Sequence, residues 1–280
     1  MRDFKGRVAV ITGAAEGIGK AIAQEAAARG MKLFLADIDA ARLEAAIASL
    51  RGEGAEVEGL RTDVAVASQV DDLANAAFAR YGNVHLLVNN AGVACAKPVW
   101  DTTPGDWEWV MGVNFYGVVN GLRAFLPRML AAGEAGHVVS TASMAGLLSL
   151  PSMAAYNASK HAVVTVMEGL HHDLAIRGSR LGASVLCPSW VKTRIAVSER
   201  NRTAGEPTDL ARLDPVAAKL VGSVHQAVSA GMDAAHVAQA VFAAIAEGRF
   251  YILTHANSKS GVKARLEDIL EDRVPTLVRL

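Results

Sequence analysis

Hydrophobic and polar positions along the chain follow an alternating pattern of short aliphatic runs and longer Ala-rich stretches. The aliphatic runs predict strands, and the Ala-rich stretches, where apolar residues recur at helical spacing, predict helices. We expect strands at residues 7–11, 32–36, 57–60, 84–88, 137–140, 183–186 and 250–253, and helices at 18–29, 40–50, 70–80, 106–130, 154–176 and 234–246. This alternation indicates an α/β protein with helices on both faces of a parallel sheet. Right-handed crossovers then give a doubly wound, Rossmann-type sheet, with any ligand beyond the carboxyl ends of the strands.

No Pro- or Gly-rich linker divides the chain, so residues 1–280 are predicted to form a single domain. Only residues 190–231 depart from the alternating pattern of strands and helices; they contain charged residues, two prolines and short apolar segments. An insert of this length in a compact domain is usually functional. The alternative is a disordered surface loop. A C-terminal extension follows the last expected strand, at about residues 254–280.

Composition narrows the function classes. Hydrophobic residues make up 51% of the chain and aromatic residues only 5%, so the core is expected to consist mainly of Ala, Val, Leu and Ile. The 28 basic and 28 acidic residues cancel, and without a basic stripe nucleic acid is not an expected partner. Neither the two cysteines, Cys95 and Cys187, nor the eight histidines have metal-ligand spacing, so no metal is predicted.

The cellular location is predicted from the same features. Two widely separated cysteines suggest a reducing compartment. The apolar stretch near the N-terminus ends at Ile11, which is too short for a signal peptide. No run approaches the ~18 apolar residues that span a bilayer. These features predict a cytoplasmic protein without a membrane partner.

A glycine-rich turn lies where the first strand ends and the first helix begins. It reads Thr12-Gly13-Ala14-Ala15-Glu16-Gly17-Ile18-Gly19, with the spacing G-x-x-x-G-x-G. Glycine allows the backbone to turn tightly and to approach a pyrophosphate, and the helix N-terminus supplies N–H donors. A plain turn is the alternative, so this motif by itself leaves dinucleotide binding open.

Asp37 ends the second strand, 18 residues after Gly19, close to where an acidic residue holds the adenosine ribose hydroxyls. A carboxylate there accepts hydrogen bonds from a diol and repels a 2′-phosphate. Glu16 adds a negative charge, and the glycine loop contains no compensating base. NAD is therefore predicted over NADP. Two alternatives stay open: Asp37 as a helix cap, and Arg42 near a phosphate.

A Tyr-x-x-x-Lys pair, Tyr156 and Lys160, places a phenol and an ammonium on one helical face. A nearby cation favours the phenolate, so we expect the tyrosine pKa to fall from its usual ~10 toward working pH. Such a phenol can donate a proton to a carbonyl oxygen or accept one from an alcohol. Ser143 lies 13 residues before Tyr156, just past the end of an expected strand.

Taken together, these motifs resemble those of the short-chain dehydrogenase/reductase family, in its compact single-domain branch. The resemblance covers about residues 6–193, with several motifs in the family's order and spacing. They are the turn from Thr12 to Gly19, Asp63-Val64, Asn89-Asn90-Ala91-Gly92, Asn114, Ser143, Tyr156-x-x-x-Lys160 and the segment from Pro188 to Thr193.

The resemblance implies a role for each position. Tyr156 is expected to be the general acid/base, with Lys160 lowering its pKa and holding the nicotinamide ribose. Ser143 is expected to bind the substrate oxygen, and Asn114 to support a water relay from Lys160. The implied cofactor contacts are Gly13, Glu16, Gly17, Ile18, Gly19, Asp37, Asp63, Val64, Asn90, Ala91, Gly92, Tyr156, Lys160, Pro188, Val191 and Thr193. Within this set, Asp63 is expected at the adenine, and Val191 and Thr193 at the nicotinamide carboxamide.

The chain departs from the family at Ser189, where the family usually has glycine after proline. Serine tolerates most glycine conformations except positive φ, so we expect the turn to survive.

The sequence predicts an oxidoreductase that transfers a hydride between NAD(H) and a secondary alcohol or ketone. The family resemblance implies that residues 190–231 cover the nicotinamide and form a substrate lid. Apolar residues of this lid and of the segment before Tyr156 favour a bulky apolar substrate: Met144, Leu147, Leu148, Met153, Ile195, Ala196, Val197, Leu210, Leu213, Leu220 and Val221. Arg194, Arg200 and Arg202 leave an anionic substrate open. The alternatives are an NADP-dependent carbonyl reductase and a non-catalytic dinucleotide-binding regulator of the same fold.

Two helical stretches are too hydrophobic for a single buried face. Residues 107–130 and the stretch after Tyr156 carry apolar side chains on more than one side. The family resemblance implies that both helices pair with their copies across a two-fold axis, which buries the same patch on each subunit. A homodimer or homotetramer is therefore predicted.

Overall fold

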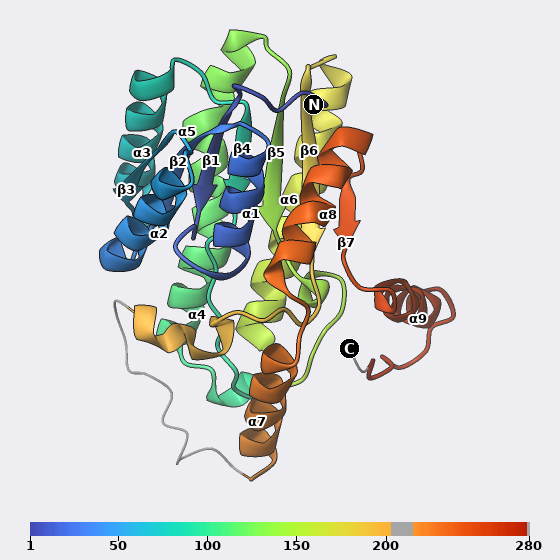
Figure 1. The fold of residues 1–280 in the computed structure, drawn as a ribbon. Coiled ribbons are helices and arrows are strands. Elements are labelled where there is room, and N and C mark those ends of the chain that lie inside the picture. Colours follow the sequence, from blue (N-terminus) through green and yellow to red (C-terminus); the bar gives the residue numbers. More distant parts are fainter. Residues whose placement is uncertain (203–214, 279–280) are drawn as a thin grey trace.

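Seven parallel strands form one sheet in the computed structural model, which describes residues 1–202 and 215–278 (Figure 1). The strands are β1 (Val8–Thr12), β2 (Lys32–Asp37), β3 (Val57–Arg61), β4 (Leu86–Asn89), β5 (Gly136–Thr141), β6 (Leu181–Cys187) and β7 (Tyr251–Leu253). Their order is β3-β2-β1-β4-β5-β6-β7, with every neighbouring pair parallel. This arrangement confirms the predicted doubly wound sheet in a single domain.

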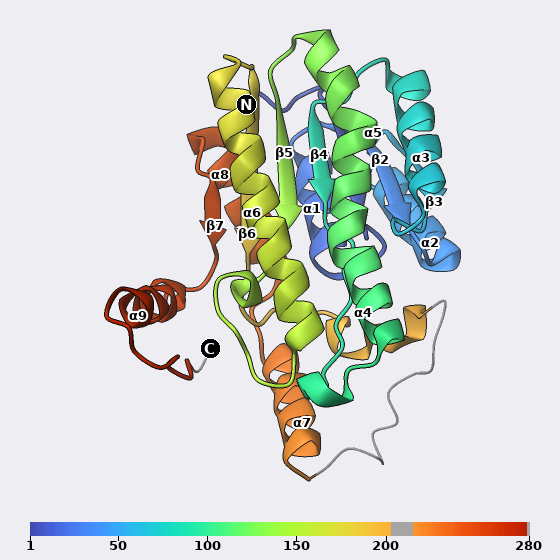
Figure 2. The same cartoon turned by 180° about the vertical axis from the view of Figure 1, so that it is seen from behind.

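Helices cover both faces of the sheet, as the sequence predicted. The helices on one face are α1 (Gly17–Ala28), α2 (Ala40–Gly52) and α8 (Ala234–Glu247), and those on the other are α3 (Ala67–Tyr81), α5 (Gly117–Ala132) and α6 (Ala154–Ile176) (Figures 1 and 2). The core is correspondingly divided into two apolar clusters. Along β1, Ala9 and Ile11 belong to one cluster and Val8 and Val10 to the other, because successive side chains point to opposite faces.

The predicted helix at 106–130 is interrupted and needs correction. It consists of α4 (Pro104–Met111), one π-helical turn at Gly112–Tyr116 and then α5. The π turn contains Asn114, whose amide group is fully buried and bonded to Val93 and Ser159. Such bulges often occur at functional sites, and apolar periodicity does not report them because the chain stays helical.

The carboxyl ends of all strands meet at one edge of the sheet. Beyond it lie a short helical segment, η4 (Ile195–Asn201), and helix α7 (Pro215–Ser229), both within the predicted lid (Figure 1). Leu210 and Leu213 lie outside the described residues. The predicted C-terminal extension contains helix α9 (Ser258–Leu270). None of the helices within residues 1–202 and 215–278 combines the length and apolar character needed to cross a membrane.

Candidate active site

A single cavity at this edge gathers most of the predicted site residues. It lies where the strand order reverses between β1 and β4, as expected for ligand crevices in doubly wound sheets. Its walls include Gly13, Glu16, Gly17, Ile18, Asp37, Asp63, Val64, Asn90, Ala91, Gly92, Ser143, Tyr156, Lys160, Pro188, Val191 and Thr193. Gly19 and Asn114 do not line it and instead lie behind its surface.

Close packing behind the glycine turn explains Gly19. A Cβ added there would lie 2.1 Å from the Gly13 carbonyl oxygen and 2.5 Å from Nδ2 of Asn90. Asn90 itself donates from Nδ2 to the carbonyls of Thr12 and Gly13, at 3.1 and 3.3 Å. Gly19 therefore lets the first turn of α1 approach β1, and Asn90 holds that turn against β4. Gly17 forms the outer part of the turn, where a Cβ would lie 3.1 Å from Cγ2 of Thr193.

Asp37 is held at the carboxyl end of β2 by two backbone groups. Its carboxylate accepts hydrogen bonds from the N–H groups of Ala15 and Asp39, each at 3.0 Å. Burial raises the pKa of Asp37 above its ordinary value, and these hydrogen bonds offset part of that rise. The alternative reading of Asp37 as a helix cap is wrong, because Asp39 caps α2 by accepting from the N–H of Arg42.

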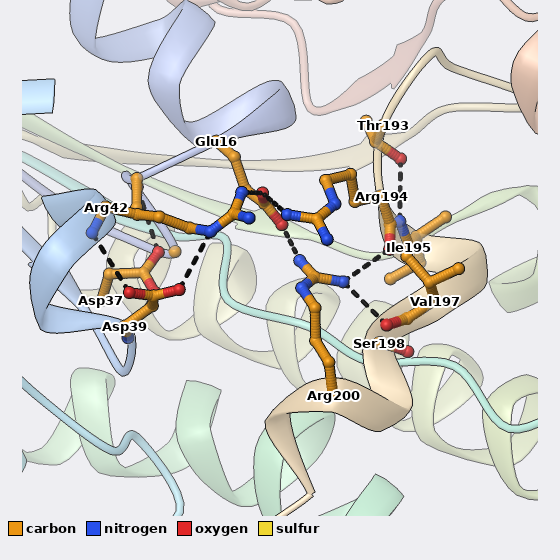
Figure 3. Close-up of polar contacts among 12 residues, drawn as sticks. Glu16, Asp37, Asp39, Arg42, Thr193, Arg194, Ile195, Val197, Ser198 and Arg200 are labelled. Atoms are coloured by element: carbon orange, nitrogen blue, oxygen red, sulfur yellow. Dashed lines mark hydrogen bonds and ion pairs between the residues drawn. The ribbon is translucent and has the colours of Figure 1, made fainter. Parts of the chain in front are cut away.

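The charge of Glu16 is compensated by arginines that lie outside the glycine loop. Its carboxylate lies 2.8 Å from Nη1 of Arg42 and 3.6 Å from Nη1 of Arg194, and it also accepts a hydrogen bond from Arg200 (Figure 3). Arg42 lies in the first turn of α2, whereas Arg194 and Arg200 follow Thr193 in the predicted lid. The sequence did not indicate this cluster, because Glu16 and Arg200 are 184 residues apart in the chain.

Asp63 and Val64 follow β3 on the adenine side of the expected site. One carboxylate oxygen of Asp63 accepts from the N–H of Ala65 at 3.0 Å. Val64 is buried against α5, where a Cβ added to Gly117 would lie 2.7 Å from its Cγ2. Asp63 is thus held by a hydrogen bond in its own turn and Val64 by packing on α5, and both residues line the cavity.

The structure brings Ser143, Tyr156 and Lys160 together at the end of β5. Nζ of Lys160 lies 5.6 Å from the ring centroid of Tyr156 and donates to the carbonyl of Thr141 at 2.9 Å. Oγ of Ser143 accepts from the N–H of Ala145 at 3.1 Å. The predicted pairing of phenol and ammonium along one helical face is thus present.

The pKa shift expected for Tyr156 is not present in this structure. Burial raises the pKa of the phenol, and a hydrogen bond from Ser143 offsets only part of that rise. The reason is that low-dielectric surroundings disfavour every charged form. The same burial lowers the pKa of Lys160 to about 8, so its own charge is weakened.

Asn114 has its hydrogen-bonding groups taken up by protein partners. Oδ1 accepts from the N–H of Val93 at 2.8 Å, and Nδ2 donates to the Val93 carbonyl at 2.9 Å and to Oγ of Ser159 at 3.0 Å. A Cβ added to Gly92 would lie 3.4 Å from both Oδ1 of Asn114 and Nζ of Lys160. Asn114 thus fastens the loop after β4 to α6, and its role in a water relay stays a prediction.

The segment from Pro188 to Thr193 is supported by a residue that the sequence analysis missed. His255, in the C-terminal extension, accepts from the N–H of Ser189 at 3.4 Å and lies 3.1 Å from the Trp190 carbonyl through its other ring nitrogen. Ser189 does not adopt positive φ, so the turn survives without glycine, as predicted. No spacing motif indicates His255, because Ser189 and Trp190 lie 66 and 65 residues away from it in the sequence.

A buried ionic network beside the cavity was also missed. Asp106 is fully buried and pairs with Nζ of Lys97 at 2.7 Å and with Nη2 of Arg202 at 2.6 Å. Burial would raise the pKa of Asp106, but these hydrogen bonds and those from Thr103 lower it to about 2. Thr103 and Asp106 form the capping box of α4, and the Thr-x-x-Asp spacing was the available signal. Within the described residues, no group of His, Cys, Asp and Glu is suited to hold a metal ion.

Comparison with known proteins identifies this arrangement of turn, sheet and Tyr-x-x-x-Lys helix. A family model described as short chain dehydrogenase matches residues 7–204. The chain belongs to the short-chain dehydrogenase family. It is therefore an oxidoreductase that uses a nicotinamide cofactor, NAD or NADP, on CH–OH groups.

Relatives match nearly the whole of this short-chain dehydrogenase. A crystal structure of a short-chain dehydrogenase/reductase from Burkholderia phymatum in complex with NAD has 48% identity and a TM-score of 0.95, covering 100% of this chain and 99% of that one. A CLA biosynthesis dehydrogenase/reductase from Lactiplantibacillus plantarum is 35% identical, over 98% of this chain and 97% of its own. A 1-deoxy-11-beta-hydroxypentalenate dehydrogenase from Streptomyces avermitilis is 34% identical, over 93% and 89%.

Proposed function

We propose that this enzyme transfers a hydride between NAD(H) and a secondary alcohol or ketone with a bulky apolar body, with Tyr156 as general acid/base. The observation that carries the proposal is the shared cavity. The glycine turn and Asp37 open into the same space as Ser143, Tyr156 and Lys160. A dinucleotide bound along that space would have its adenosine end at Asp37 and its reactive end beside the tyrosine.

The residues of the cavity fit a dinucleotide. Glycines lie where a side chain would intrude: a Cβ at Gly13 would lie 2.8 Å from Cα of Ala91. Glu16, the N-cap residue of α1, makes no side-chain capping bond, which leaves first-turn N–H groups for a phosphate. Asp37 has a carboxylate for the adenosine ribose, and Lys160 has an ammonium for the nicotinamide ribose.

The protein residues supply the proton chemistry. When bound, the nicotinamide accepts or gives the hydride. Ser143 would donate a hydrogen bond to the substrate oxygen and hold it against the phenol of Tyr156. Tyr156 would donate its proton to that oxygen during reduction or accept one during oxidation. The ammonium of Lys160 would stabilise the phenolate, which favours proton exchange in a cavity where burial opposes charge.

Apolar walls support a bulky apolar substrate. Besides Met153, Ile195 and Ala196, which the sequence analysis named, the cavity is lined by Val93, Ala94, Leu150, Trp190, Val224 and Val228. Met144 and Leu148 are instead buried in the core and do not line it. Because η4 and α7 supply part of this wall, we retain as the lid those residues of 190–231 that the structure describes, 190–202 and 215–231. Arg202 is nearly buried and paired with Asp106 and Glu199, which argues against an anionic substrate bound by this arginine.

The test is a panel of secondary alcohols with NAD⁺ and ketones with NADH, read by nicotinamide absorbance. Turnover is expected to rise with the apolar size of the substrate. Turnover on small polar substrates alone would contradict the substrate class. Binding of NADH without turnover on any member would favour a non-catalytic regulator instead.

Cofactor choice gives a second test. The Asp37 carboxylate, at the predicted ribose position, accepts hydrogen bonds from two backbone N–H groups, and its negative charge should repel a 2′-phosphate. We expect kcat/KM with NAD to exceed that with NADP by at least about tenfold, and Asp37→Ala to narrow the ratio. Asp71→Ala, which removes an exposed ion pair between Asp71 on α3 and Arg123 on α5, is the matched control. A preference of the unaltered enzyme for NADP would mean that Arg42 outweighs Asp37.

We further propose a homodimer or homotetramer formed through α5 and α6. The two helices lie side by side on one face of the sheet (Figure 2). Apolar side chains of these helices remain partly exposed, among them Val119, Leu122, Val166 and Leu170, and so does Phe115 in the π turn before α5. Burying them against a second copy would remove apolar surface from water. Light scattering is expected to give at least twice the chain mass of 29.3 kDa. An active monomer would contradict this assembly.

A further inference from the structure

One carboxylate faces three guanidinium groups at the mouth of the cofactor cavity. Glu16 lies in the glycine turn, and Arg42, Arg194 and Arg200 converge on it from two different parts of the chain (Figure 3). Arg42 has a second carboxylate partner, Asp39, at 3.0 Å. For Arg194 and Arg200, Glu16 is the only acidic partner among the described residues. Two lid arginines therefore share one carboxylate, which leaves an excess of positive charge.

Arg200 is held by its own segment as well as by Glu16. Its guanidinium also donates to the carbonyls of Arg194 and Val197, at 3.0 and 2.8 Å, within its own segment. The segment η4 is anchored on its other side, where Oγ of Ser198 donates to the Ala94 carbonyl and accepts from the Ala94 N–H at 3.1 and 2.9 Å. The buried pair of Arg202 and Asp106 adds to this anchor. Thus η4 is fixed beside the loop after β4 and presents Arg200 across the cavity toward the glycine turn.

The place where these charges meet favours an anion. Glu16 is the N-cap residue of α1, and its side chain makes no capping bond to the helix. The N-terminus of α1 and the guanidinium groups of Arg194 and Arg200 line the same cavity. A guanidinium binds phosphate oxygens in bidentate fashion, and a pyrophosphate offers more charge and more acceptors than a single carboxylate.

We propose that Arg194 and Arg200 are ligands of the cofactor pyrophosphate, and that Glu16 occupies them until the dinucleotide binds. The inference rests on the proposed function. Pyrophosphate binding displaces the Glu16 carboxylate from the two lid arginines, and Glu16 stays with Arg42. The arginines then join the lid to the bound cofactor. Glu16 competes with the cofactor in this scheme, whereas in a simple latch it would fasten the lid and assist binding.

Calorimetry on the cofactor-free enzyme separates these roles, with ADP-ribose and adenosine as the probes. Because a charge-assisted contact is lost, Arg200→Met is expected to weaken ADP-ribose binding by about tenfold. Adenosine, which has no phosphate, should bind equally to the variant and the unaltered protein. Equal weakening for both probes, or no weakening, would overturn the proposal. Arg177→Met, which removes an exposed ion pair with Asp173 at the far end of α6, is the control.

The direction in which Glu16→Gln changes the affinity for ADP-ribose distinguishes a competitor from a latch. If Glu16 is a competitor, this variant should bind ADP-ribose several-fold more tightly, and the gain should vanish in the Glu16→Gln, Arg200→Met double variant. If Glu16 is a latch, binding should weaken. Glu25→Gln, on the same helix and paired with Arg29, is the matched control. Failure of the unaltered protein to bind either probe would refute the proposed cofactor site itself. Binding that is insensitive to both Arg200→Met and Glu16→Gln would refute only the proposed exchange of Glu16 for pyrophosphate at the arginines.

Discussion

The Tyr156→Phe variant is expected to lose about 10²–10⁴-fold in kcat on any substrate of the enzyme, because the proton donor is removed while the ring stays. The phenol lies beside Lys160, and both residues share the cavity wall with Ser143. The ring packing is unchanged in the variant, so the midpoint of thermal unfolding and the Kd of NADH should stay close to those of the unaltered protein.

Tyr81→Phe is the matched control for this substitution. It also removes a phenolic hydroxyl, which donates to the Leu33 carbonyl at 3.2 Å beside β2, away from the reactive end of the cavity. Its kcat should be unchanged, with any effect confined to stability. Near-normal turnover by Tyr156→Phe would refute Tyr156 as the general acid/base.

The Lys160→Met variant should lose at least about 10²-fold in kcat, since the phenolate of Tyr156 is no longer stabilised. Lys160 is 3% exposed, and its ammonium has one protein hydrogen bond, to Thr141. Methionine fills much of the same volume, so the fold should persist. Steady-state kinetics with a substrate from the panel, together with NADH binding, measure the two consequences separately.

The same variant also makes a prediction about stability and pH. Burial lowers the pKa of Lys160 from 10.5 to about 8 in the folded protein. Between these values the unfolded chain binds more protons than the folded one, so the free energy of unfolding rises with pH across the window. The methionine variant lacks this rise. Denaturant unfolding below and above about pH 8 should therefore show the unaltered protein gaining stability relative to the variant as pH increases. A constant difference would mean that Lys160 titrates normally.

Residues close together in the sequence were sufficient to predict the sheet and several residues of the candidate site. The glycine turn, Asp37, and the pair of Tyr156 and Lys160 were identifiable because each depends on residues close together in the sequence. The strand and helix alternation predicted the sheet for the same reason, since buried parallel strands are continuous aliphatic runs. The π turn at Asn114 was not identifiable, because a wider helical turn leaves the apolar pattern almost unchanged.

Tertiary structure alone decided the electrostatics of the site. The sequence suggested an acidic glycine loop, yet folding places Arg42, Arg194 and Arg200 on Glu16. It suggested a lowered pKa for Tyr156, yet burial raises it. Charge effects depend on distance and on surrounding dielectric, and both are set by which segments pack together. The sequence thus determined which chemical groups this enzyme has and the fold that gathers them, while only the folded chain decided which charges face one another.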